Sequence, residues 1–290
     1  MRSSGSQSGS KRALDCGETE NSQCHRRRGQ GQLWIVSLGP GSSEHLTPRA
    51  LEALQQAEVI VGYKTYVSLI EPLVQGKTLR TSGMRKEMDR CREAIHLALE
   101  GYRVALVSGG DAGIYGMAGL VFDVCQAQGV AVRDGSTYTN TPRDVLPVEV
   151  IPGVAAFNAA ASLLGAPLMH DFASISLSDH LTPWKVIEKR LEAAASADFV
   201  LALYNPRSAT RPDVLDRARA VLLRHRMGET PVGVVHKAMR EGQRYWVTTL
   251  RDLVCEDVDM QTVVLVGNSQ TYIWNGWMIT PRGYLEKYGT

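Results

Sequence analysis

Apolar runs and amphipathic stretches alternate along the chain from residue 33 onward. Short apolar runs that end in glycine or proline indicate buried strands, and apolar residues at helical spacing indicate helices. The pattern predicts strands over residues 33–38, 57–63, 103–108, 172–177, 198–204, 231–236, 245–249 and 262–267. It predicts helices from Thr47 onward and over residues 85–100, 114–127, 154–164, 184–195 and 212–226. This alternation is typical of an α/β fold, and the short turns between the later strands favour a second sheet of mixed strand direction.

The composition divides the chain into a tail and two halves. Residues 1–32 are rich in Ser, Gly, Gln and Arg and almost free of large apolar side chains, which predicts disorder. An organelle transit peptide is the alternative, and the acidic residues in this segment count against it. A polar stretch over residues 133–143 indicates an exposed loop. We therefore expect an N-terminal α/β domain over residues 33–147 and a C-terminal α/β domain over residues 148–290.

Two glycine-rich turns each follow a predicted strand. Gly39-Pro40-Gly41 ends the first, and Gly109-Gly110-Asp111 ends the strand over 103–108. Open α/β sheets bind small molecules beyond the carboxyl ends of their strands, and glycine lets the backbone come close to a ligand. The turns match neither the dinucleotide fingerprint nor the phosphate-binding P-loop. They indicate a ligand site of another kind, with a simple tight turn as the alternative.

Charge and cysteine content narrow the class of protein. The net charge is +2, from 32 Lys and Arg against 30 Asp and Glu; six basic and three acidic residues lie in residues 1–32, which leaves 26 basic and 27 acidic residues for the rest. A nearly neutral body argues against nucleic-acid binding. The cysteines include no C-x-x-C pair, so we expect no metal site and a reducing, cytoplasmic location. No apolar stretch is long enough to predict a membrane span.

Four motifs follow one another in an order that resembles the tetrapyrrole methylases, which use S-adenosylmethionine. These motifs are Gly39-Pro40-Gly41, Gly109-Gly110-Asp111, Pro152-Gly153-Val154 and Leu203-Tyr204-Asn205-Pro206. The resemblance covers residues 33–290, and the stretch from Leu164 to Trp184 is most similar to the members that methylate carbon 17 of precorrin-3B. It implies two α/β domains with the cofactor in the cleft between them, a homodimer, and methylation coupled to contraction of the macrocycle to give precorrin-4, with S-adenosylhomocysteine as the second product.

The resemblance also implies which residues line the cofactor: Pro40, Gly109, Gly110, Asp111, Ile114, Ala155, Ala156, Tyr204 and Asn205. For Asp111 a helix cap is an equal alternative, and for Tyr204 and Asn205 the alternative is a plain turn before Pro206. The family often has a hydroxyl residue where this chain has Ala155, which leaves only a backbone contact at that point. The loop over residues 133–147 also looks longer than is usual in the family.

The implied substrate has many carboxylates, which arginine and lysine bind. Basic residues at or just past predicted strand ends are candidates for this role, with a solvated surface position as the alternative for each: Arg85, Lys86, Arg207, Arg211, Lys237 and Arg240. Ring contraction also needs proton transfers. The densest titratable group flanks the predicted strand 172–177 and comprises His170, Asp171, Asp179 and His180. A structural turn at His170-Asp171 is the competing interpretation.

Three other functions remain open. The same cofactor could serve the cobalt-containing equivalent substrate. It could also serve another acceptor used by relatives, such as a different tetrapyrrole carbon, a diphthine precursor or a ribosomal RNA ribose. A carrier that binds a corrinoid or the cofactor without turnover is the non-enzymatic alternative. The neutral body argues against RNA, and the stretch from Ser176 to Trp184 argues for carbon 17.

Overall fold

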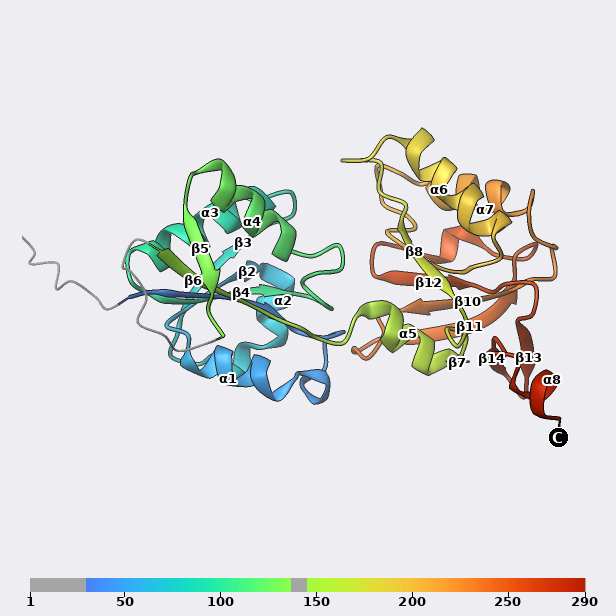
Figure 1. Ribbon diagram of the computed structural model, residues 1–290, viewed down its shortest axis with the longest axis horizontal. Coiled ribbons are helices and arrows are strands. Elements are labelled where there is room, and N and C mark those ends of the chain that lie inside the picture. Colours follow the sequence, from blue (N-terminus) through green and yellow to red (C-terminus); the bar gives the residue numbers. More distant parts are fainter. Residues whose placement is uncertain (1–29, 137–144, 290) are drawn as a thin grey trace, which may run out of the picture.

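The computed structural model describes residues 30–136 and 145–289, which form two lobes (Figure 1). The first lobe contains β1 Gln32–Ser37, α1 Pro48–Gln56, β2 Val59–Tyr63, α2 Lys64–Leu69, β3 Thr78–Ser82, α3 Glu87–Leu99, β4 Arg103–Ser108, α4 Ala118–Ala127, β5 Ala131–Asp134 and β6 Val145–Ile151. The second contains α5 Ala156–Leu164, β7 Gly165–Ala166, β8 Phe172–Ser176, α6 Trp184–Ser196, β9 Val200–Tyr204, α7 Val214–Leu222, β10 Pro231–His236, β11 Arg244–Thr249, β12 Thr262–Val266, β13 Tyr272–Trp274, β14 Trp277–Ile279 and α8 Tyr284–Tyr288.

The first sheet is parallel, and its six strands have the order β3-β2-β4-β1-β6-β5. Helices cover both faces, with α3 and α4 on one side and α1 on the other (Figure 1). Alternate residues of β1 therefore enter different cores: Leu33 and Ile35 pack toward α3 and α4, whereas Trp34 and Val36 pack toward α1. A strand buried on both faces has a continuous apolar sequence, which is why the central strands were predictable.

The second sheet has mixed strand direction, as predicted. Its five strands have the order β11-β10-β12-β9-β8, with β8 and β9 parallel and the other neighbours antiparallel. Helices α6 and α7 cover one face, and α5 covers the other (Figure 1). A small three-stranded sheet, β13-β14-β7, lies at the end of this lobe.

Apart from β6, which lies between β1 and β5, the elements that the sequence did not predict are short or lie at a sheet edge. Helix α2 has six residues and no side-chain cap, and every residue of β3 is polar except Leu79. The exposed loop predicted over residues 133–143 is wrong at its start, because β5 includes Asp134, and the longer span to residue 147 overlaps β6, which starts at Val145. The predicted disorder of the N-terminal tail falls almost wholly on residues 1–29, which lie outside the described residues.

Strand β6 bears on the expected domain division. It pairs with β1 as far as Ile151, so a division after residue 147 would cut this strand. We propose to place the division after Ile151, where the chain crosses from the first lobe to α5 (Figure 1). In the part of the chain that the structure describes, no helix is long and apolar enough to cross a membrane.

Candidate functional site

Three turns lie side by side at the carboxyl edge of the first sheet. Strands β4, β1 and β6 are neighbours and run parallel, so the turns that follow them are adjacent. The backbones of Gly39 and Gly110 exchange hydrogen bonds: Gly110 N donates to Gly39 O at 2.7 Å, and Gly39 N donates to Gly110 O at 3.0 Å. Both residues have positive φ, +66° and +67°, a region that favours glycine.

Asp111 joins the turn after β4 to the turn after β6. Its Oδ1 accepts a hydrogen bond from Gly113 N at 2.8 Å, and its Oδ2 accepts one from Gly153 N at 3.0 Å. Helix α4 begins only at Ala118, so the carboxylate does not cap that helix. Hydrogen bonds to a carboxylate are among the stronger ones in proteins. Asp111 therefore holds two turns at a fixed separation.

Gly110 is less closely packed than the neighbouring glycines Gly109 and Gly153. A Cβ built on Gly153 would come within 2.6 Å of Ser37 Cβ, and one on Gly109 within 2.6 Å of the Tyr66 ring, so both glycines are packed against protein. A Cβ on Gly110 would meet one atom within 4 Å, Ala156 N at 3.6 Å. The backbone at Gly110 is therefore accessible on the side that faces the start of α5.

The side chain of Tyr204 caps the amino end of helix α5, which the N-cap residue Ala155 cannot do. Ala155 is the N-cap of α5 and has no side-chain hydrogen bond, whereas the Tyr204 hydroxyl oxygen accepts a hydrogen bond from Phe157 N at 3.0 Å. Burial raises the pKa of Tyr204 to about 12, so the hydroxyl stays protonated at neutral pH. The next residue, Asn205, has φ +55°, and its Nδ2 donates to Ser176 Oγ at 2.8 Å.

Contacts between the lobes gather around these same residues. The ring of Tyr115, from the first lobe, lies 5.1 Å from that of Tyr204, and its hydroxyl donates to Ser174 O at 2.9 Å. From the second lobe, Arg240 Nε donates to Pro40 O at 2.5 Å. Ile114 packs against the apolar cluster around α5. The structure thus brings all nine of the expected cofactor residues to one region between the carboxyl edge of the first sheet and α5.

The six basic candidates have different surroundings. Arg207 donates to Cys255 O, Arg211 lies 3.7 Å from Asp179, and Lys86 forms an exposed ion pair with Asp89. Arg85 and Lys237 form no side-chain hydrogen bond or ion pair within residues 30–136 and 145–289. Arg85 follows β3 on the carboxyl edge of the first sheet, and Lys237 follows β10.

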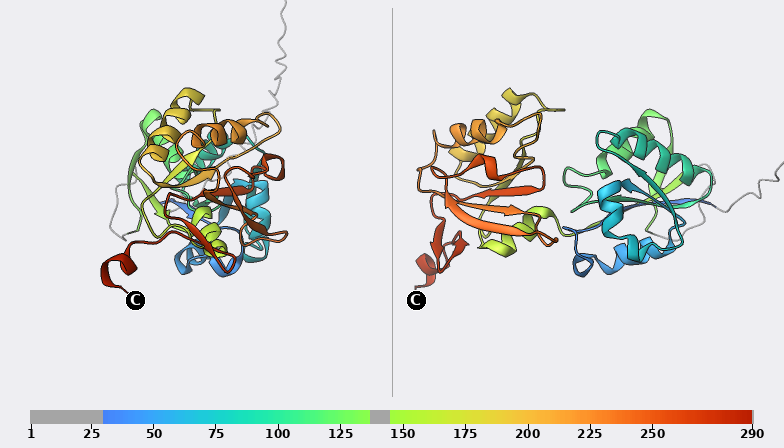
Figure 2. Two further views of the ribbon diagram at one scale, coloured as in Figure 1. Left: turned by 90° about the vertical axis from the view of Figure 1, so that its right-hand side faces the viewer. Right: turned by 180° about the vertical axis from the view of Figure 1, so that it is seen from behind.

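The four acid/base candidates separate into two pairs. His170 and Asp171 precede β8, and Asp179 and His180 follow it. The carboxyl ends of β8 and β9 lie on the side of Tyr204 and the first lobe, and the segment between β8 and α6 projects toward that lobe (Figure 1, Figure 2). The structure therefore brings Asp179 and His180 to the site edge and leaves His170 and Asp171 at the opposite edge of the second sheet.

Tyr66, Tyr115 and His236 also lie near the site, although no sequence motif indicated them. His236 is buried, with Nδ1 3.2 Å from Asp259 Oδ1 and 3.3 Å from Thr262 Oγ1. Tyr115 has φ +53°, an uncommon value for a side chain of this size. Tyr115 lies outside the helices and strands, and Tyr66 lies on α2, a helix of six residues, so hydrophobic periodicity gave no signal for them.

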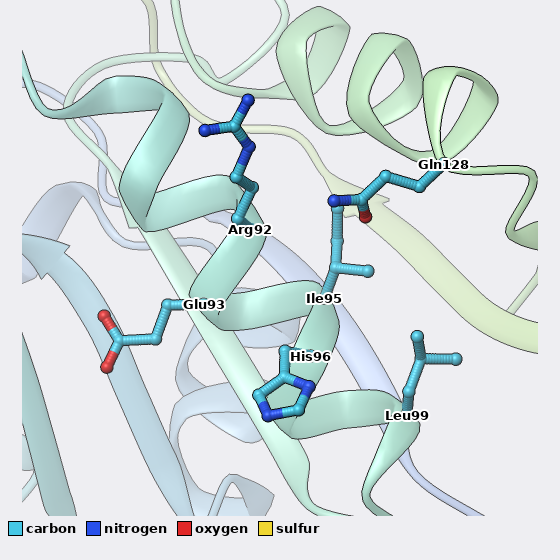
Figure 3. Close-up of a pocket in the computed structure, with 6 residues that line it drawn as sticks. All are labelled: Arg92, Glu93, Ile95, His96, Leu99 and Gln128. Carbon is cyan, nitrogen blue, oxygen red and sulfur yellow. The ribbon is translucent and has the colours of Figure 1, made fainter.

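A surface hollow elsewhere on the first lobe does not touch these turns. Figure 3 shows its lining residues, which lie on the last turns of α3 and at the end of α4: Arg92, Glu93, Ile95, His96, Leu99 and Gln128. Because α3 runs antiparallel to the strands beside it, its end lies near the amino edge of the sheet. Among the described residues, no cluster of His, Cys, Asp and Glu could hold a metal ion.

Comparison with known proteins identifies relatives over most of the chain. The sequence model of the Tetrapyrrole (Corrin/Porphyrin) Methylases matches residues 32–254. The chain is 51% identical over 252 residues to the "Probable cobalt-factor III C(17)-methyltransferase" of Salmonella typhimurium, covering 87% of this chain and 99% of that relative. It is 48% identical over 259 residues to the "Cobalt-factor III methyltransferase" of Priestia megaterium, covering 89% of this chain but only 46% of that relative.

A solved structure supports the same assignment of the fold. The crystal structure of the methyltransferase CobJ aligns with a TM-score of 0.78 and 38% identity, covering 87% of this chain and 100% of that one. The expected fold class, α/β lobes of the tetrapyrrole methylase type, is confirmed.

Proposed function

Because the chain belongs to the tetrapyrrole (corrin/porphyrin) methylase family, we propose that it transfers a methyl group from S-adenosylmethionine to carbon 17 of a precorrin-3B-type macrocycle in cobalamin biosynthesis. The reaction includes contraction of the macrocycle and releases S-adenosylhomocysteine. The observation that carries the proposal is the 51% identity to a relative of that name over 99% of its length. Whether the macrocycle contains cobalt is part of the test below.

The turns at the carboxyl edge of the first sheet fit the methyl donor. The backbone at Gly110 is open toward Ala156, and the neighbouring glycines keep side chains away from the edge. Pro40, Gly109, Gly110, Ile114, Ala155 and Ala156 would line the donor through backbone groups and apolar surface. S-adenosylmethionine supplies an electrophilic methyl group on a sulfonium sulfur. The protein's part is to orient two ligands and exclude water, and Asp111, Tyr204 and Asn205 serve this by fixing the turns.

Basic side chains on both lobes would bind the carboxylates of the macrocycle. Arg85 and Lys237 are unpaired among the described residues and stand on opposite lobes. Arg240 uses Nε on Pro40 O, which leaves its two terminal nitrogens for a carboxylate. Arg207 and Arg211 hold backbone carbonyls of the second lobe, and Lys86 pairs with Asp89, so we give these three a weaker role.

Proton transfer during ring contraction would fall to Asp179 and His180. Both lie on the segment that projects toward the first lobe, and Arg211 Nε lies 3.7 Å from Asp179 Oδ1. A carboxylate and an imidazole are both side chains that can accept and return a proton. His170 and Asp171, at the far edge, would have a structural role, consistent with the bond from Asp171 N to His170 Nδ1. The proposal includes a homodimer in the cytoplasm.

A turnover assay tests the proposal. The full chain is incubated with isotope-labelled S-adenosylmethionine and either precorrin-3B or its cobalt-containing equivalent, and products are analysed by mass and absorption spectrum. We expect one added methyl group and a contracted macrocycle from one or both substrates. Transfer without contraction would remove the second half of the proposal. Binding of the donor without transfer to either macrocycle would point to the non-enzymatic carrier.

A further inference from the structure

A buried arginine lies beneath the turn that follows β3. Arg90, in the first turn of α3, has only 6% of its side chain exposed. Its Nη1 donates to Ser82 Oγ at 2.9 Å and to Gly83 O at 2.8 Å, and its Nη2 donates to Glu87 Oε1 at 3.0 Å. A guanidinium presents its donors in a rigid plane. Arg90 therefore fixes the end of β3 against the start of α3.

The turn that Arg90 holds is itself exposed to solvent. We call residues 83–86 the β3 turn; all four are exposed, and Met84 has 63% of its surface accessible. Arg85 has φ +60°, a left-handed conformation that is uncommon for a residue other than glycine. Such a backbone persists only where the surrounding structure holds it, and it is frequent at ligand sites. A buried cation therefore supports an exposed turn that presents one apolar and one basic side chain.

A series of aromatic contacts joins Arg90 to the glycine turn after β4. The Arg90 Cζ atom lies 6.0 Å from the centre of the Tyr63 ring, at the limit of a cation–π contact. The rings of Tyr63 and Tyr66 meet edge to face, with their centres 5.4 Å apart. Tyr66 packs against Gly109, where an added Cβ would lie 2.6 Å from the ring. These contacts hold the β3 turn at a fixed position relative to Gly109.

The β3 turn lies on the same edge of the first sheet as the proposed donor site. Strand β2 lies between β3 and β4, and the three strands are parallel. Because neighbouring strands are about 4.8 Å apart, the carboxyl ends of β3 and β4 are separated by roughly 10 Å. A tetrapyrrole macrocycle, with four rings joined in a cycle and carboxylates on its rim, extends over at least that distance. An acceptor bound beside the donor therefore reaches the β3 turn.

We propose that Arg90 is a positioning residue for the acceptor: it holds the β3 turn so that Met84 packs on the macrocycle and Arg85 binds one of its carboxylates. The inference rests on the proposed function and adds a residue that does not itself touch the ligand. Methionine adapts to irregular apolar surfaces, and the arginine fork binds a carboxylate through two hydrogen bonds. Since methyl transfer depends on the alignment of donor and acceptor, a turn fixed relative to Gly109 aligns the acceptor.

Steady-state kinetics at varied macrocycle concentration test this role. Arg90→Met should raise the KM for the macrocycle about tenfold, as expected for loss of one hydrogen bond to a charged group. The Kd of S-adenosylhomocysteine should stay near its wild-type value, because the turns after β4, β1 and β6 keep their own hydrogen bonds. Arg90→Lys keeps the charge but reaches fewer of the acceptors, so its KM should lie between the two.

A second buried arginine provides the matched control. Arg226 is buried in the second lobe, and its Nη2 donates to Phe199 O at 2.7 Å, just before β9 and at the opposite edge of the second sheet from Tyr204. Arg226→Met should lower the melting temperature and leave the KM for the macrocycle unchanged. Circular dichroism confirms that each variant is folded.

Two further measurements test whether Arg90 acts through the turn. Arg85→Ala alone should raise the KM by a similar factor, and combining it with Arg90→Met should raise the KM little further, because both changes remove the same contact. Limited digestion with trypsin gives a readout that does not depend on turnover. Cleavage after Arg85 or Lys86 should be faster in Arg90→Met than in the wild type or in Arg226→Met, because a released turn opens more readily.

The possible failures are distinguishable. A wild type that transfers no methyl group to a macrocycle overturns the proposed function, and with it the acceptor role of the β3 turn. With an active wild type, four results overturn this inference alone: a wild-type KM in Arg90→Met, an equal rise of KM in Arg226→Met, full additivity with Arg85→Ala, or unchanged tryptic cleavage of the β3 turn in Arg90→Met.

Discussion

Asp111→Asn is the sharpest probe of how the three turns are held. The carboxylate accepts one hydrogen bond from Gly113 N and one from Gly153 N. Asparagine keeps one acceptor oxygen but presents an NH₂ group to the other N–H donor, so one bond is lost and two donors face each other. A hydrogen bond to a charged group contributes about 1.5–3 kcal/mol. Because Asp111 is partly exposed, we take the lower end, about 1.5 kcal/mol.

If the turns form the donor site, this energy should appear in ligand affinity as well as in stability. Calorimetric titration with S-adenosylhomocysteine should give a Kd raised about tenfold, since about 1.4 kcal/mol corresponds to a factor of ten. The melting temperature should fall by roughly 3 °C. Asp123→Asn, an exposed aspartate on α4, is the control and should change neither value. An Asp111→Asn variant with wild-type Kd and melting temperature would refute the role that we assign to this carboxylate.

Three further predictions concern side chains around the site and in the cores. Tyr204→Phe should cost about 1 kcal/mol by leaving Phe157 N without its acceptor. Burial raises the pKa of Tyr204 to about 12. The free energy of unfolding of the wild type should therefore exceed that of Tyr204→Phe by a constant amount below about pH 10, and this difference should decline as the pH rises toward 12. Urea unfolding of both proteins across that pH range measures the difference. Gly41→Ala should displace Arg240 from Pro40, because the new Cβ would lie 2.6 Å from Arg240 Nε. The double variant Gly41→Ala, Arg240→Ala should therefore have nearly the same melting temperature as Gly41→Ala alone. If the two decreases in melting temperature add in full, the contact between Arg240 and Pro40 does not contribute. Burial raises the pKa values of three thiols, those of Cys91, Cys125 and Cys255. In a background with Cys16 and Cys24 changed to Ser, these thiols should react with iodoacetamide only after the protein unfolds. Rapid labelling of the native protein, measured by mass spectrometry, would contradict this prediction.

Hydrophobic periodicity by itself determined the central strands and the long helices. Strands such as β1 and β4 are buried on both faces, so the four central residues of each are all apolar, and α3 and α6 each bury one stripe. The glycine turns were also recognisable, because a backbone with positive φ at Gly39 and Gly110 has a strong residue preference. Motif order then indicated the family, which the comparisons confirm.

Edge elements and long-range partners depended on the tertiary structure. Strand β3 has little apolar pattern because it lies exposed at the sheet edge, and it forms by pairing with β2. The role of Asp111 depends on Gly153, which lies 42 positions along the chain and becomes a neighbour only because β4, β1 and β6 are adjacent in the sheet. Likewise, His170 and Asp179 are close in sequence but lie at opposite ends of β8. Sequence specifies local preference, whereas the distance between such groups is fixed by strand order and direction, which are set by packing across the whole sheet.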